Sequence, residues 1–132
     1  PAERFVADFI GETNFLSAEV VAVSGDRARV RLSSGAEIPA TFPADLTPDG
    51  KVTVVVRPEH AQVAAPSPSS VLRGTIHEIV YLGTDTHFHI RLEDGTTFTV
   101  RQQNARSGSC GFSKDEVVGI SLSDDVAQIL RD

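Results

Sequence analysis

The sequence repeats itself, and a repeat restricts the possible folds of a chain more than any other feature. Residues 31–35 (Arg-Leu-Ser-Ser-Gly) resemble residues 91–95 (Arg-Leu-Glu-Asp-Gly), residues 16–20 resemble 72–76, and residues 61–63 resemble 127–129. The separations of 60, 56 and 66 residues differ because of small insertions, one of which falls at residues 81–85. The chain is therefore predicted to hold two copies of one unit of about 55 to 60 residues.

Within each copy the apolar residues follow a period of two, which is typical of half-buried β-strands. The first copy shows this pattern at residues 19–23, 28–32 and 52–56, and the triplets 24–26 and 33–35 supply the Gly, Ser and Asp of tight hairpins. Small units of short strands close readily into barrels, because closure removes exposed strand edges. We expect an all-β fold of two tandem OB-like five-strand barrels.

These patterns divide the chain into four segments. Residues 1–14 are predicted to form a short helix and a junction, residues 15–65 the first OB-like unit, and residues 71–132 the second unit. Residues 66–70 (Pro-Ser-Pro-Ser-Ser) contain two prolines and no large apolar side chain. This composition indicates a linker between the two units.

The opening segment is the only one with a clear helical period. Phe5 and Phe9, and likewise Val6 and Ile10, are apolar pairs four residues apart, so they share one face of a helix over residues 1–11. A helix of about ten residues is not stable alone in water. These four side chains therefore require a partner surface, which the barrels, a second copy or a missing domain would supply.

The charge balance argues against a polyanionic ligand. Twelve basic and 18 acidic residues give a formal net charge of −6, whereas nucleic-acid-binding proteins neutralise phosphates with Lys and Arg. The single Cys excludes an intrachain disulfide and fits a reducing compartment. No apolar stretch reaches the ~18 residues of a membrane span. We expect a cytoplasmic protein that does not bind nucleic acid.

Three local patterns invite a chemical interpretation. His87 and His89 point to one side of a strand, where His77 or Glu78 could complete a zinc site, but two histidines on a solvated face are the simpler interpretation. Cys110 stands in a Gly-rich loop without the local signature of a catalytic cysteine. The chain has three pairs of adjacent carboxylates, Glu93 with Asp94, Asp115 with Glu116, and Asp124 with Asp125. They are predicted to be turn and surface charges. No metal-binding or catalytic residue is expected.

Three segments, taken in order, resemble a known family. Residues 5–16 are similar to the junction at which the nucleotide-binding domain of ABC importer ATPase subunits passes into its C-terminal regulatory domain. Arg57, Pro58 and Glu59 resemble the Arg-Pro-Glu signature of these domains, which are called TOBE, for transport-associated OB. Residues 80–83 with 92–95 match their usual hairpin. The fold expected from the resemblance is the TOBE/MOP-like pair of barrels.

Residues 11–14 and 103–104 look most like the spermidine/putrescine importers, although sugar and ferric-iron importer subunits carry similar tails. The resemblance implies a non-catalytic regulatory and dimerisation domain of a bacterial ATP-binding subunit, peripheral on the inner face of the inner membrane. Its partners would be the ATPase domain of the same subunit, a second copy of that subunit and, indirectly, the membrane permease subunits.

ATP and Mg²⁺ would bind in the missing domain, and no cofactor is expected in this chain. A phosphate-binding loop needs glycines, a Lys and a hydroxyl residue at fixed spacing. Here Gly50 and Lys51 have Asp45 in place of the first Gly and Val52 in place of Ser or Thr. The Gly-rich residues 108–114 have the wrong order and are predicted to form a loop.

The residues expected to position or contact the partners are Phe5, Val6, Phe9, Ile10, Arg57, Pro58 and Glu59. For Arg57, Pro58 and Glu59 a purely structural role is an equal alternative. In that role Pro58 would end a strand, and Arg57 and Glu59 would form an exposed ion pair.

The alternative function is a small-ligand module. Related duplicated barrels bind oxyanions such as molybdate, and Ser33, Ser34, Gly35 and Lys51 could serve that use here. The acidic balance of the chain disfavours an anionic ligand.

Overall fold

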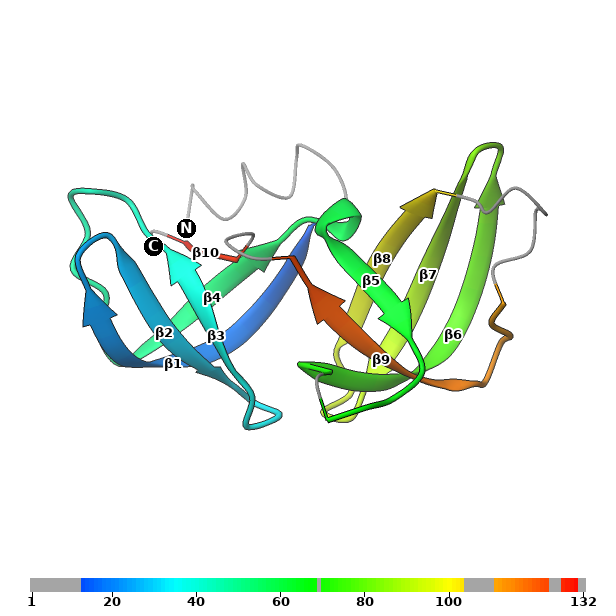
Figure 1. Cartoon of the computed structure of the whole chain (residues 1–132), viewed down its shortest axis with the longest axis horizontal. Helices are drawn as coiled ribbons and strands as arrows, with labels where there is room; N and C mark the ends of the chain where they lie inside the picture. The colour runs from blue at the N-terminus through cyan, green and yellow to red at the C-terminus, as the bar shows by residue number, and fades with distance from the viewer. Residues whose placement is uncertain (1–12, 69, 104–110, 124–126, 131–132) are drawn as a thin grey trace. The chain divides into compact units, whose positions relative to one another are not determined.

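The structure is a computed structural model that describes residues 13–68, 70–103, 111–123 and 127–130. Its regular elements are ten strands and one short 3₁₀ helix (Figure 1). In chain order they are β1 (Asn14–Ser24), β2 (Arg27–Leu32), β3 (Glu37–Thr41), β4 (Lys51–Val56), η1 (Pro58–His60), β5 (Ala61–Ala64), β6 (Leu72–Leu82), β7 (Asp85–Leu92), β8 (Thr97–Gln103), β9 (Val117–Leu122) and β10 (Gln128–Ile129). The predicted helix over residues 1–11 lies outside the described residues.

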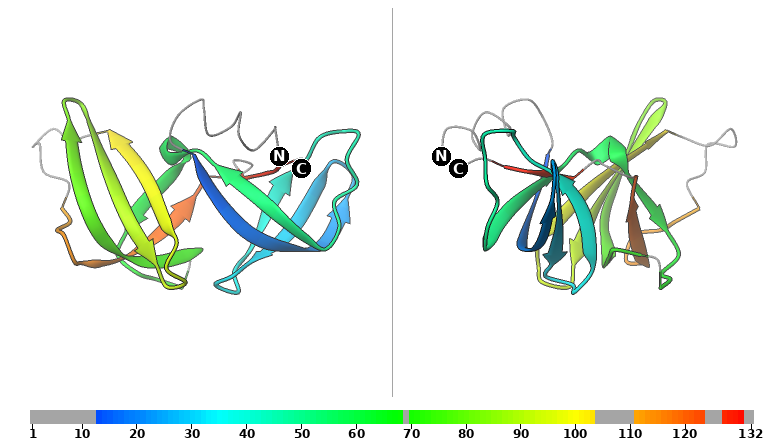
Figure 2. Two further views of the ribbon diagram at one scale, coloured as in Figure 1. Left: turned by 180° about the vertical axis from the view of Figure 1, so that it is seen from behind. Right: turned by 60° about the vertical axis from the view of Figure 1, so that its left-hand side comes forward.

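The strands group into two compact units, each with five of them. One unit runs to Arg57 and resumes at Ser123, and the other is Pro58–Leu122. Within each unit the strands curl around a common interior, as the two further views show (Figure 2). The expected all-β fold of two OB-like five-strand units is therefore confirmed.

The first unit is a closed barrel with the strand order β1-β2-β3-β10-β4. Because side chains alternate along a strand, each strand places one of its faces inside. In β2 the inward residues Ala28, Val30 and Leu32 are buried, and the residues between them are exposed. Val54 and Val56 of β4 are fully excluded from solvent.

The second unit is a five-stranded sheet with the order β5-β9-β6-β7-β8. The largest fully buried side chains of the protein's described part lie here, and they are Phe88, Phe98, Ile76 and Ile90. Phe112 packs edge-to-face on Phe88, with the ring centroids 6.2 Å apart. Aromatic side chains therefore form part of this core.

Local irregularities repeat at equivalent positions of the two copies. Gly35 and Gly95 both adopt a positive φ near 90°, and the N–H of each donates to the carbonyl at the end of the preceding strand at 2.9 Å. Only Gly adopts this conformation without strain. β1 carries a bulge between Val20 and Ala22, and β6 carries one between Ile76 and Glu78.

The first hairpin is longer in the second copy. Beyond the bulge, β1 and β2 form three residue pairs, whereas β6 and β7 form five. The insertion near residues 81–85 therefore lengthens both strands, and it leaves Tyr81 and Leu82 exposed at the tip.

The two copies exchange their fifth strands. β5 follows β4 in the chain but pairs antiparallel with β9 in the second unit. β10 follows β9 but pairs antiparallel with β4 and parallel with β3 in the first unit. The repeat predicts that residues 61–63 and 127–129 are equivalent strands, and each completes the unit built by the other copy.

This exchange gives boundaries that differ from the predicted units 15–65 and 71–132. The predicted linker 66–70 stands between β5 and β6, which both belong to the second unit, so its described residues, 66–68 and 70, lie inside that unit and do not link the two units. The chain passes between the units after Arg57 and after Leu122. Composition cannot reveal such an exchange, because the sequence pattern of a strand is the same whichever sheet the strand joins.

We predict that a fragment of residues 58–122 folds and that a fragment of residues 71–132 does not. The first contains all five strands of the second unit, while the second lacks β5 and exposes one edge of β9. Thermal unfolding followed by circular dichroism should show a cooperative transition only for the first fragment. Cooperative unfolding of 71–132 alone would contradict the exchanged arrangement.

Candidate functional site

The Arg-Pro-Glu segment lies where the chain leaves the first unit and enters the second. Arg57 is exposed directly after β4, Pro58 is buried as the first residue of η1, and Glu59 is exposed. The fixed φ of proline suits the first position of a helical turn. In the described part of the chain Arg57 and Glu59 do not pair with each other. The other four predicted contact residues, Phe5, Val6, Phe9 and Ile10, lie outside the described residues.

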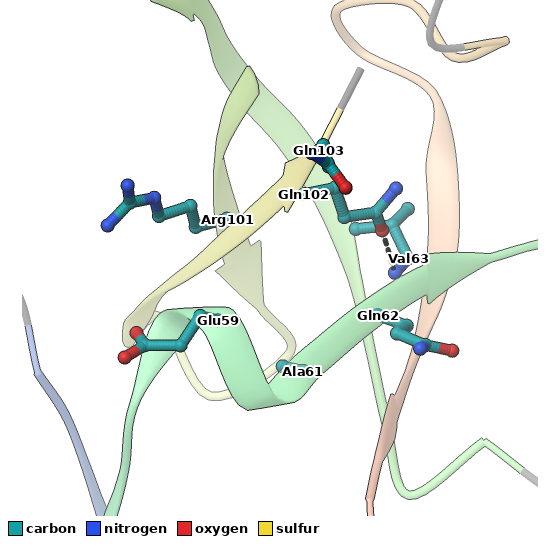
Figure 3. Close-up of a pocket in the computed structure, with 7 residues that line it drawn as sticks. All are labelled: Glu59, Ala61, Gln62, Val63, Arg101, Gln102 and Gln103. Atoms are coloured by element: carbon teal, nitrogen blue, oxygen red, sulfur yellow. Dashed lines mark hydrogen bonds between the residues drawn. The ribbon is translucent and has the colours of Figure 1, made fainter. Parts of the chain in front are cut away.

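Glu59 borders a seam between β5 and β8, the two end strands of the second sheet. In the first unit the equivalent gap is closed by backbone pairing, because the N–H of Thr41 donates to the carbonyl of Ala127 at 3.0 Å. In the second unit the side chain of Gln102 spans the gap instead. Its Oε1 accepts the N–H of Val63 at 2.6 Å (Figure 3). One amide side chain thus replaces a strand pairing.

A pocket of about 320 Å³ opens along this seam. It is lined by Glu59, Ala61, Gln62, Val63, Arg101, Gln102 and Gln103 (Figure 3). The side chain of Arg101, on β8, is held against β7, because its Nε and Nη2 donate to Oδ2 of Asp85 at 2.9 and 2.7 Å. The seven lining residues include no Ser, Cys, His or Lys. The pocket therefore offers hydrogen-bonding amides, one carboxylate and one guanidinium group.

Sequence reasoning missed this pocket. Gln103 drew attention only through its resemblance to polyamine importers, and Gln102 follows the exposed Arg101 without any special pattern. The missing information is the place of β5 beside β8, which the exchange of strands decides. No local sequence signal reports it.

The histidines and carboxylates occupy surface and turn positions. His87 and His89 lie on the outer face of β7, where Nδ1 of His89 is 3.3 Å from Oγ1 of Thr99. Asp94 Oδ1 accepts the N–H of Thr96 at 2.9 Å, and Glu116 Oε1 accepts the N–H of Ser113 at 2.9 Å.

Among the described residues no group of three or more His, Cys, Asp or Glu side chains is arranged to hold a metal ion. Cys110, Asp124 and Asp125 lie outside the described residues. No helix in the part of the chain that the structure describes is long and apolar enough to cross a membrane.

The residues considered for oxyanion binding lie on different parts of the first unit. Ser34 Oγ accepts the N–H of Ala36 inside the turn after β2. Lys51 begins β4 and lies opposite Glu19 of β1.

Taken together, the described residues form two duplicated β units, and the second of them carries a polar pocket. The chain matches the family model described as TOBE domain over residues 54–130. It therefore belongs to the TOBE domain family.

Its relatives include the spermidine/putrescine import ATP-binding proteins PotA of Mesorhizobium japonicum, 52% identical, and of Ruegeria pomeroyi, 53% identical. Both matches extend over 132 residues, all of this chain, but cover only 36% and 35% of those proteins. The chain thus spans about a third of the relatives' length and matches their C-terminal region. The family resemblance predicted from residues 5–16, Arg57–Glu59 and the second hairpin is confirmed.

A solved structure shares the fold. ModG, a cytoplasmic molybdate-binding protein with molybdate bound, superposes with a TM-score of 0.71 at 15% identity, over 89% of this chain and 94% of that one. At this identity the likeness concerns the fold alone.

We predict that Gln102→Ala lowers the free energy of unfolding by about 1–2 kcal/mol, because the N–H of Val63 loses its partner in a partly buried seam. Gln103→Ala, which removes the adjacent amide, should change it by less than about 0.5 kcal/mol. Urea unfolding followed by circular dichroism measures both. Equal effects of the two substitutions would show that the Gln102 bond does not hold the seam.

Proposed function

We propose that this chain is the regulatory and dimerisation domain at the C-terminus of an ATP-binding subunit of a bacterial polyamine importer. The observation that carries the proposal is the 52–53% identity to two spermidine/putrescine import ATP-binding proteins over all 132 residues. In the proposal an ATPase domain in the same subunit binds ATP and Mg²⁺. The present chain contributes no catalytic group and acts at the cytoplasmic face of the inner membrane.

The proposed mechanism is contact rather than chemistry. The ATPase domain would couple to the module through Phe5, Val6, Phe9 and Ile10, whose predicted helix needs a partner surface. Burying a Phe side chain contributes about 1.5–3 kcal/mol, so two of them could hold a neighbouring domain in one orientation. Arg57, Pro58 and Glu59 would set the path by which the chain enters the second unit. A second subunit and, indirectly, the permease would complete the assembly.

The transported substrate is tested by deleting the gene that encodes this chain in its own host. Uptake of radiolabelled spermidine and putrescine should be lost, and the full-length gene should restore it. A copy whose phosphate-loop Lys is replaced should fail to restore uptake, which would tie transport to ATP hydrolysis. Sugar and ferric-iron uptake serve as matched controls. Unchanged polyamine uptake with loss of sugar or iron uptake would contradict the polyamine assignment.

The contact mechanism is tested in the full-length subunit with Phe5→Ser and Phe9→Ser combined. We expect lower transport-coupled ATPase activity and weaker dimerisation, because the apolar stripe loses most of its buried area. Arg4→Ser with Asp8→Ser, on the opposite side of the predicted helix, is the control and should leave both unchanged. If the Phe variant keeps the melting temperature, the activity and the dimerisation of the parent, the segment is only a tether.

A further inference from the structure

The sequence contains two Asp-Gly pairs, Asp49 with Gly50 and Asp94 with Gly95. In such a pair the amide nitrogen of Gly can attack the side-chain carboxyl group of Asp, because Gly has no side chain to hinder the approach and has the least restricted backbone. All four residues are exposed. Exposure therefore does not distinguish the two pairs, and their hydrogen bonds have to be compared.

Hydrogen bonds hold the pair in the second unit. Oδ1 of Asp94 accepts the N–H of Thr96 at 2.9 Å. The N–H of Gly95 donates to the carbonyl of Leu92, also at 2.9 Å. Attack by the Gly nitrogen requires rotation of the peptide group between Asp94 and Gly95 and removal of the amide proton, so both bonds oppose the reaction.

The pair in the first unit stands directly before β4 and is held differently. Within the described ranges neither the carboxylate of Asp49 nor the N–H of Gly50 forms a hydrogen bond. The bond that Gly50 makes is through its carbonyl, which belongs to the next peptide group. The peptide group between Asp49 and Gly50 can therefore rotate into the attacking geometry without breaking a hydrogen bond.

The carbonyl of Gly50 takes part in closing the first barrel. It accepts the N–H of Val20 at 2.9 Å, at the bulge of β1. Lys51 then begins the pairing of β4 with β1, opposite Glu19 (Figure 1). A longer main chain at Asp49 would displace the Val20 bond and loosen the start of this pairing.

We infer that Asp49 is a modification site at which the chain converts itself to the isoaspartyl form. The nitrogen of Gly50 bonds to Cγ of the protonated Asp49 carboxyl group, a Cγ–O bond breaks, and the hydroxyl leaves with the amide proton as water. Water then opens the resulting succinimide ring. Opening at Cγ restores Asp49, whereas opening at the main-chain carbonyl leaves a chain that runs through Cγ and is one methylene longer.

The test incubates the 132-residue chain at neutral pH, below its melting temperature, and takes samples over several weeks. A purified isoaspartyl methyltransferase then transfers a radiolabelled methyl group from S-adenosylmethionine to each isoaspartyl carboxylate. Trypsin places the two pairs in separate peptides, 32–51 and 92–101. Peptide 32–51 should gain label about tenfold faster, because two hydrogen bonds slow the reaction in 92–101.

Two variants assign the label to its residue. Asp49→Ser should abolish most of the label in peptide 32–51. The matched control is Asp94→Ser, which installs the residue found at the equivalent position of the first copy, where Ser34 Oγ accepts the N–H of Ala36. It should leave the label in 32–51 unchanged. Thermal melts of the fresh variants check the fold, and the aged parent should melt at a lower temperature than aged Asp49→Ser.

Three results would overturn the inference. The first is equal labelling of the two peptides in the folded chain. The second is label in peptide 32–51 that persists in Asp49→Ser, which would assign it to Asp45. The third is a difference of the same size after incubation in concentrated urea, which would show that the neighbouring sequence and not the fold selects Asp49. These measurements need neither transport nor ATPase activity, so the proposed function is tested separately.

Discussion

Reciprocal pairing of the fifth strands is the constraint on which the rest of the structure depends. Without β10 the first barrel would expose edges of β3 and β4, and without β5 the second sheet would expose an edge of β9. Unpaired backbone groups of this kind are costly when buried and promote aggregation when exposed. The pairing joins residues as far apart as Thr41 and Ala127, which are 86 positions apart. Closing so long a loop is entropically unfavourable and is offset only when the whole chain folds.

The two units share one plan but close it differently, and the differences mark the surfaces of interest. In the first unit backbone bonds seal the gap beside the fifth strand, whereas in the second a single Gln102 side chain spans it and leaves a pocket. The outer faces of the two units differ as well. The first unit exposes Arg29 between uncharged neighbours, while the second surrounds the equivalent His89 with polar partners. The duplication allows the two copies to be compared within one molecule. A feature that the fold requires recurs in both copies, so a feature present in one copy alone is not required by the fold.

If the module acts by contact, as proposed, its function depends on the surfaces that it presents. In the second unit the seam pocket is lined by amide, carboxylate and guanidinium groups. The passage from Arg57 to Glu59 carries the chain from one unit into the other and borders that pocket. In the proposed function a partner at the seam would lie beside the segment that links the units. Family membership and the high identity to importer subunits agree with this view.

The sequence alone determined the strand pattern, the duplication, the equivalence of residues 61–63 with 127–129 and the family. Each of these is local, because periodicity, turn residues such as Gly35 and short motifs act within a few positions of the chain. Tertiary structure decided which sheet receives β5 and β10, and with it the unit boundaries, the Gln102 seam and the isolation of Arg29. These features depend on pairing between distant segments, and every strand offers the same backbone donors and acceptors to any partner. The choice is therefore made by the packing of the whole chain.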